Sequence, residues 1–150
     1  MKATTLRTYA LLAFLVVMIA GFFVLKNKDF DRNLAAVWDT GAFTLNVYGN
    51  MNLTGSPTYI ATTQSINSGS IPPSATDLSA RWTGTITAPK ASTYQFMVES
   101  EDGVRIFVDN KQILSRWSDQ NRWEAFTTSL SAGQHTLKVE YYQQGAKGRV

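Results

Sequence analysis

The chain has 150 residues, of which 44% are hydrophobic and 17% are charged, and this composition excludes an intrinsically disordered chain. The formal net charge is +3, but the basic residues are scattered, which argues against nucleic acid as a partner. The chain has no cysteine, which excludes disulfides, zinc sites built on thiolates and a cysteine nucleophile.

An uncharged apolar segment from Tyr9 to Leu25 follows a short basic flank at residues 1–8. As a helix the segment would be about 25 Å long, at the short end of what spans a bilayer. It is longer than the apolar core of most cleaved signal peptides, and it lacks the small residues of a cleavage site. We therefore predict a transmembrane signal anchor at 9–25 and a juxtamembrane linker at 26–37. A cleaved signal peptide is the alternative.

Residues 38–150 show short segments in which apolar and polar residues alternate, which indicates strands with one face toward a core. Turn-forming residues separate them at 88–91, 101–103, 109–111 and 131–134. The pattern predicts an all-β antiparallel sandwich or barrel, preceded by the one transmembrane helix. The expected inward residues are Leu78, Ala80, Trp82, Tyr94, Phe96, Val98, Val104, Ile106, Val108, Leu137, Val139 and Tyr141.

Two stretches are less regular. Residues 50–76 are rich in Ser, Thr, Asn, Gly and Pro, and we expect a loop there with one or two short strands. Ile60, Ile66 and Ile71 are its candidate anchors in the core. The stretch at 115–126 also looks like a loop.

A series of short motifs follows in order between residues 78 and 142. They are Arg81-Trp82-x-Gly84, Ala88-Pro89, Tyr94-x-Phe96, Glu101-Asp102-Gly103, Val104-Arg105-x-x-Val108-Asp109, Trp117, Ala132-Gly133-x-His135 and Tyr141-Tyr142. In this order they resemble the protective-antigen-type ("PA-fourteen") β-domain of toxins, glycosidases and adhesins. The resemblance extends from about residue 45 to the last residue.

The resemblance implies an antiparallel β-barrel or sandwich that is mostly non-catalytic and in several members binds carbohydrate. No catalytic constellation stands beside the lone His135, so we do not expect an enzyme. We expect a single-pass membrane protein whose β-domain, at residues 38–150, is a binding module for glycans on the extracytoplasmic side. A structural or scaffolding ectodomain that binds a surface protein is the alternative. The family has one further short strand, so we expect truncation at the last strand, with an open edge as the alternative.

The resemblance also implies a candidate metal site. In the fungal adhesins two adjacent aspartates of this hairpin, joined by a cis peptide bond, hold a calcium ion that binds sugar hydroxyls. These positions correspond to Glu101 and Asp102. Calcium takes six to eight oxygen ligands, which a carboxylate pair supplies in part. The competing interpretation is an ordinary acidic turn in which Arg105 pairs with Glu101 or Asp102, and the Glu in place of Asp favours it.

Further candidate ligand-binding residues lie in loops. Trp117 and Trp123 fall in the loop-like stretch, where an exposed ring could stack on a sugar, whereas Trp82 is expected in the core. The final loop should face the hairpin in this family, and it offers Gln144 and Lys147 but no carboxylate.

Overall fold

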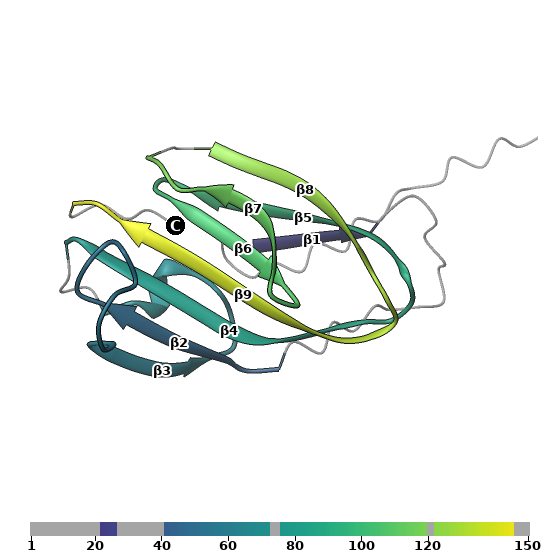
Figure 1. The fold of residues 1–150 in the computed structure, drawn as a ribbon, viewed down its shortest axis with the longest axis horizontal. Helices are drawn as coiled ribbons and strands as arrows, with labels where there is room; N and C mark the ends of the chain where they lie inside the picture. The colour runs from purple at the N-terminus through teal and green to yellow at the C-terminus, as the bar shows by residue number, and fades with distance from the viewer. Residues whose placement is uncertain (1–21, 27–40, 73–75, 120–121, 146–150) are drawn as a thin grey trace, which may run out of the picture.

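The computed structural model describes residues 22–26, 41–72, 76–119 and 122–145 (Figure 1). Within these residues the chain forms antiparallel strands and one short 3-10 turn at Ser68–Ser70. The strands are β1 (Phe22–Lys26), β2 (Phe43–Tyr48), β3 (Tyr59–Thr63), β4 (Leu78–Ala88), β5 (Ser92–Ser100), β6 (Val104–Val108), β7 (Lys111–Arg116), β8 (Arg122–Leu130) and β9 (Gly133–Gln143).

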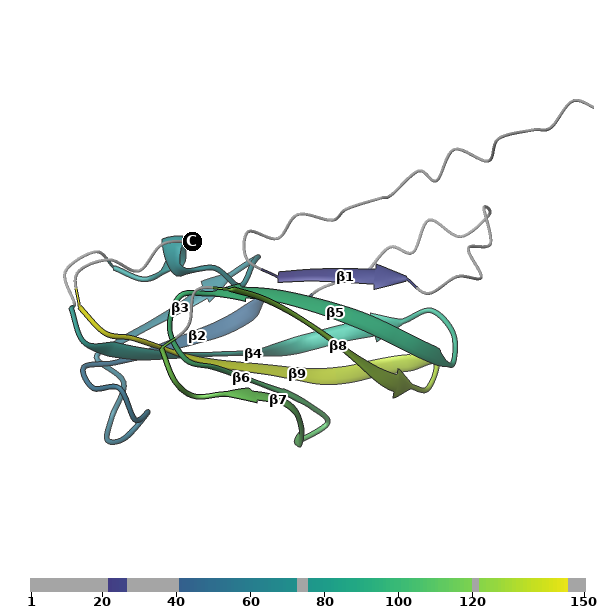
Figure 2. The same ribbon diagram turned by 90° about the horizontal axis from the view of Figure 1, so that it is seen from above.

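The strands form two sheets that pack face to face, with the orders β3-β2-β4-β9-β6-β7 and β1-β5-β8 (Figure 2). The longest ladder joins β4 to β9 and runs from the pair Leu78 and Gln143 to the pair Ala88 and Gly133. This arrangement confirms the predicted all-β antiparallel fold, and of the two expected forms it is the sandwich.

The core lies between the two sheets and contains the inward residues that the alternation predicts. Trp82 of β4 is 2% exposed, Phe96 of β5 is 0% exposed and Leu137 of β9 is 1% exposed. The irregular stretch contributes Ile66 and Ile71, which are also buried. Ile60 is not an anchor: it lies on the edge strand β3 and is 63% exposed, because it is opposite Asn46 of β2, which lies opposite the outward-facing Arg81.

The stretch expected to be a loop at 115–126 is only partly one. Trp117 lies in the connection after β7, but Trp123 belongs to β8. The β8 strand pairs with β5 from Ser92 opposite Leu130 to Ser100 opposite Arg122. Backbone hydrogen bonding along this ladder, rather than a local sequence pattern, keeps the segment extended.

The predicted membrane anchor falls mainly outside the described residues. Its last four residues, 22–25, are extended in β1 and pair with β5 from Phe22 opposite Val98 onward, so for them the structure differs from the expected helix. Pairing with the edge of β5 satisfies backbone groups that a helix would satisfy internally. In the part of the chain that the structure describes, no helix is long and apolar enough to cross a bilayer.

The turn between β6 and β7 is a two-residue hairpin, with Val108 opposite Lys111. Asp109 and Asn110 have φ angles of 49° and 64°, the left-handed region that tight hairpins require and that Asp and Asn tolerate. This confirms the turn predicted there. The Asp109 carboxylate also accepts a hydrogen bond of 2.9 Å from the backbone N–H of Thr136 on β9. The turn is thereby fixed to a second strand.

His135 completes this attachment. Its Nδ1 lies 2.6 Å from Oδ2 of Asp109, and its Nε2 lies 3.0 Å from the carbonyl oxygen of Ser131. Both partners accept hydrogen bonds, so the doubly protonated ring satisfies both. The hydrogen bond to Asp109 raises the pKa of His135 above its usual 6.5. The same bond lowers the pKa of Asp109 below its usual 3.8.

We expect the domain to lose stability as the pH rises from below 6.5 through the raised pKa of His135. A raised pKa on folding means that His135 stabilises the fold fully below its unfolded pKa, and that this contribution disappears as the pH rises through the folded pKa. The contribution of Asp109 to stability depends on pH in the opposite direction, because it disappears as the pH falls through the lowered pKa of Asp109. The Asp109 side chain is 55% exposed, so we expect a loss of about 1 kcal/mol or less.

Thermal unfolding of the full chain in detergent, over a pH series that starts below 6.5, measures this loss. Asp109→Asn is the control, because it keeps the shape of the side chain but removes the charge that holds the proton on His135. The variant should show a flatter pH dependence than the wild type. The same pH dependence in both proteins would contradict a charged pair.

Candidate functional site

Segments that are far apart in the sequence meet at one end of the sandwich. The carbonyl oxygen of Gly103, in the β5–β6 turn, accepts a hydrogen bond of 3.0 Å from the N–H of Tyr142 near the end of β9. The Tyr142 hydroxyl donates in turn to Oδ1 of Asp119, beyond β7, at 2.6 Å. The N–H of Gly145 donates to Oδ1 of Asp77, before β4, at 2.9 Å. We call this end, with residues 77, 101–103, 117–119 and 142–145, the hairpin end.

The acidic pair of the β5–β6 turn lies at the centre of the hairpin end. Asp102 is 8% exposed, and its Oδ2 accepts a hydrogen bond of 3.3 Å from the N–H of Gln144. Its carbonyl oxygen accepts a second bond from the Ser100 hydroxyl. Burial raises the pKa of Asp102, and the nearby carboxylates of Asp119 and Glu101 raise it further, against the effect of the Gln144 N–H. The turn therefore concentrates negative charge in a partly dehydrated place.

Trp117 borders this acidic turn. Its ring meets the ring of Tyr142 edge to face, with centroids 4.9 Å apart. The guanidinium carbon of Arg105 lies 3.8 Å from the centroid of the Trp117 ring. Gly103 allows this close approach, since a Cβ there would lie 3.1 Å from the Cα of Trp117. The indole is thus held on two sides, and it joins the hairpin end to the outer face of the larger sheet.

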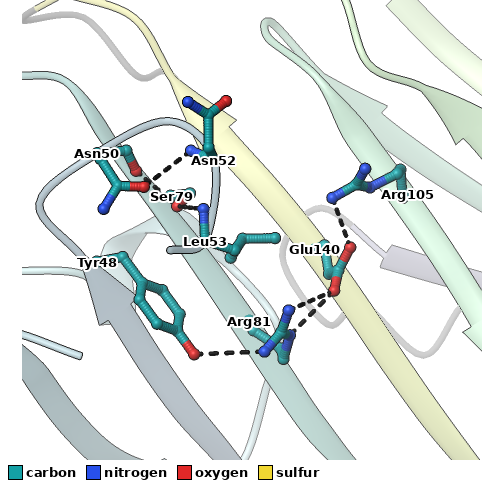
Figure 3. Close-up of polar contacts among 8 residues, drawn as sticks. All are labelled: Tyr48, Asn50, Asn52, Leu53, Ser79, Arg81, Arg105 and Glu140. Atoms are coloured by element: carbon teal, nitrogen blue, oxygen red, sulfur yellow. Dashed lines mark hydrogen bonds and ion pairs between the residues drawn. The ribbon is translucent and has the colours of Figure 1, made fainter. Parts of the chain in front are cut away.

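An ion network lies on that outer face (Figure 3), and its Arg105 contacts Trp117. Glu140 of β9 receives Nη2 of Arg81 at 2.8 Å on Oε1 and Nη2 of Arg105 at 2.8 Å on Oε2. Arg81 also donates to the Tyr48 hydroxyl at 3.3 Å. The expected pairing of Arg105 with Glu101 or Asp102 is therefore wrong, because β6 lies next to β9 and its register places Arg105 opposite Glu140.

The hairpin end fits the calcium interpretation only in part. Asp102 and Glu101 are close enough for their charges to interact, as are Asp102 and Asp119. In the part of the chain that the structure describes, however, no group of three or more His, Cys, Asp or Glu side chains is placed to hold a metal ion. The peptide bond between Glu101 and Asp102 is trans, unlike the cis bond that the resemblance implies. Calcium binding stays a prediction for a titration.

The other predicted site residues have different outcomes. Gln144 lies at the hairpin end through its bond to Asp102, as does Trp117 through its contact with Tyr142. Trp123 is 45% exposed and lies opposite Glu99 of β5, on the outer face of the smaller sheet. Lys147 lies outside the described residues.

Sequence reasoning missed several members of the hairpin end. Asp77 and Asp119 carry no motif, and nothing local relates them to a glycine or tyrosine many residues away. The Tyr-Tyr pair in the resemblance pointed to Tyr142, but it did not point to Asp119, the partner of its hydroxyl. Carboxylates, a backbone amide and an indole in one place are the groups that bind sugar hydroxyls and the apolar face of a sugar ring.

Comparison with known proteins agrees with the fold. The PA14 domain model matches residues 35–150. Anti-sigma-I factor RsgI3 of Acetivibrio thermocellus is 37% identical over 67 residues, which are 43% of this chain and 10% of that protein. The solved structure of an anti-sigma factor domain-containing protein from Clostridium clariflavum has a TM-score of 0.62 and 26% identity, over 73% of this chain and 39% of that one.

A solved glycosidase also has this fold. The GH31 alpha-xylosidase of Xanthomonas citri has a TM-score of 0.57 and 17% identity, over 85% of this chain and 17% of that one. At this identity the likeness shows the fold alone. The present chain thus spans less than half the length of each of these proteins. Since the family model matches most of the chain, the resemblance deduced from the motifs is confirmed, and the chain belongs to the PA14 domain family.

Proposed function

We propose that this chain is a non-catalytic, membrane-anchored cell-surface module that binds carbohydrate at its hairpin end, with the β-domain on the extracytoplasmic side. The observation that carries the proposal is the buried Asp102 carboxylate, held by the Gln144 N–H beside Trp117 and Tyr142. Such an acceptor is positioned before any ligand arrives, so a sugar hydroxyl would not have to order it. Membership of a family whose fold also occurs in glycosidases supports the same class of ligand.

A glycan array with the full chain in detergent, which keeps β1 paired with β5, tests this proposal. Wild type should bind at least one class of glycan, and Asp102→Asn should weaken that binding by about tenfold, the loss of one charge-assisted hydrogen bond. Glu99→Gln is the matched control. It also neutralises one carboxylate, but this carboxylate belongs to a residue of β5 on the outer face of the smaller sheet, opposite Trp123.

The outcomes separate the candidate sites. If only Asp102→Asn loses binding, the hairpin end is supported as the binding site. If Glu99→Gln loses binding equally, the face that carries Trp123 is the better candidate. The same array with calcium or with EDTA tests calcium assistance. Binding that disappears in EDTA supports a metal ion at Glu101 and Asp102, and unchanged binding would reject it.

A scaffolding ectodomain that binds a protein partner is the second candidate. The observation that favours it is the pair of relatives that are named as anti-sigma factors rather than as sugar-cleaving enzymes. A blank array with a well-folded domain would favour this candidate. Crosslinking on intact cells would then seek the partner.

A further inference from the structure

The outer face of the six-stranded sheet carries charged side chains in register. Arg81 of β4 lies opposite Glu140 of β9, which lies opposite Arg105 of β6. In the neighbouring rung, Lys138 of β9 lies opposite Phe107 of β6. All five side chains point away from the core, because the residues between them on the same strands are the buried ones. Two adjacent rungs therefore hold three cations and a single carboxylate.

The cations of this face are held in place by aromatic rings. Nζ of Lys138 lies 4.0 Å from the centroid of the Phe107 ring, and the Arg105 guanidinium lies on Trp117. Such contacts fix the position of a cation but do not neutralise it. In this orientation the buried Nε of Arg105 has no hydrogen-bond partner among the described residues.

A rigid loop borders the same face (Figure 3). Oδ1 of Asn50 accepts hydrogen bonds from the N–H groups of Asn52 at 3.0 Å and Thr54 at 3.2 Å. Leu53 has a φ of 58°, a strained value for a side chain of its size, and its N–H donates to the Ser79 hydroxyl at 2.9 Å. Strained residues that the surroundings hold in place occur often at functional sites. The loop is thereby held on Ser79, two residues before Arg81 on β4, and its Asn52 is exposed.

The face continues into the hairpin end through Trp117, which contacts both Arg105 and Tyr142. The two regions have opposite charge. Carboxylates lie at the hairpin end, at Glu101 and Asp102, whereas cations predominate on the sheet. A ligand that covers both must therefore place neutral hydroxyls at the turn and negative charge over the strands.

We propose that the ligand is an extended saccharide that carries carboxylate groups, and that Arg105 and Lys138 bind a carboxylate on the outer sheet face while neutral hydroxyls occupy the hairpin end. This inference rests on the carbohydrate binding proposed above and adds a second contact region and an acidic class of sugar. Charge complementarity favours a carboxylate there, since the excess cations are already fixed by the rings beneath them.

Calorimetry with two saccharides tests the inference. One probe is an oligouronate, and the other is the neutral oligosaccharide of equal length made by reducing its carboxylates. The full wild-type chain in detergent should bind the oligouronate about tenfold or more tightly than the reduced probe, and added salt should shrink that difference. Lys138→Glu should remove the difference. Lys90→Glu is the matched control, the same charge change in the turn between β4 and β5.

The outcomes are distinct. Equal affinity for the two probes would overturn the acidic ligand and leave the proposed carbohydrate binding intact. No binding of either probe, nor of any glycan on the array, would overturn both. A loss of preference in Lys90→Glu as large as in Lys138→Glu would show an effect of net charge instead of this face. Equally tight binding of single-stranded DNA would show a general attraction for polyanions, and it too would overturn the inference.

Discussion

Replacing Gly103 with alanine should destabilise the domain strongly and disrupt the hairpin end. The new Cβ would lie 2.1 Å from Cε1 and 2.6 Å from Cδ1 of Tyr142, far inside the contact distance. The ring cannot move aside cheaply, because its hydroxyl is bonded to Asp119 and its face meets Trp117. We expect a loss of about 2–4 kcal/mol in the free energy of unfolding, from overpacking together with a broken hydrogen bond.

Chemical denaturation of the full chain in detergent measures this loss, and a double-mutant cycle assigns its cause. In a Tyr142→Ala background the clash is absent, so Gly103→Ala should cost much less there than in the wild type. Gly49→Ala is the matched control, since its Cβ would meet a methyl group of Thr58 at an ordinary 3.6 Å. Equal costs of Gly103→Ala in both backgrounds would show that the Tyr142 ring does not pack on this glycine.

The central strands could be predicted from the sequence because each has one face toward the core and the other face outward. On β5 and β6, Tyr94, Phe96 and Ile106 face the core and alternate with residues that face outward. Period-two alternation of this kind is the pattern that half-buried strands produce. The Asp-Asn hairpin turn was predictable for a similar reason, since few residues tolerate a positive φ.

The β8 strand could not be predicted from the same signal. Its inward positions, such as Glu124, Phe126 and Thr128, are only half buried, and its outward positions include Trp123. Apolar and polar residues therefore fall on both faces, and the alternation is lost. The strand is defined by its ladder with β5, which is a contact between distant segments. Sequence pattern alone does not reveal such a contact.

The candidate site was predictable only as far as motifs mark it. The resemblance led to Glu101, Asp102 and Gln144, and the structure brings these residues together at one end. The predicted partner of Arg105 was wrong, because an acidic pair that is near in the sequence does not show which strand lies alongside β6. Glu140 shows no local sign of being the shared partner of two arginines. The strand order β4-β9-β6 decides that pairing, and it follows from the whole fold.

Glu140→Gln should be the second strongly destabilising change. The Glu140 side chain is 5% exposed and it balances two arginines whose side chains are 32% and 29% exposed. Glutamine keeps the shape, but its amide group would face the guanidinium of Arg81 or Arg105, donor against donor. Two half-buried cations would then lack a counter-charge. We expect a loss of about 2–4 kcal/mol, toward the low end for breaking a buried ion pair because the arginines keep some contact with water.

The matched control is Glu124→Gln, which neutralises the carboxylate of a more exposed pair, 2.9 Å from Nε of Arg116. Exposed pairs contribute about 1 kcal/mol or less, so its cost should be small and should shrink in high salt. The cost of Glu140→Gln should persist in salt, since the ions of the solution screen a buried charge poorly. Denaturation of both variants at low and high salt makes the comparison. Equal, salt-sensitive costs would show that the Arg81–Glu140–Arg105 network behaves as an ordinary surface cluster and does not organise the outer face of the sheet.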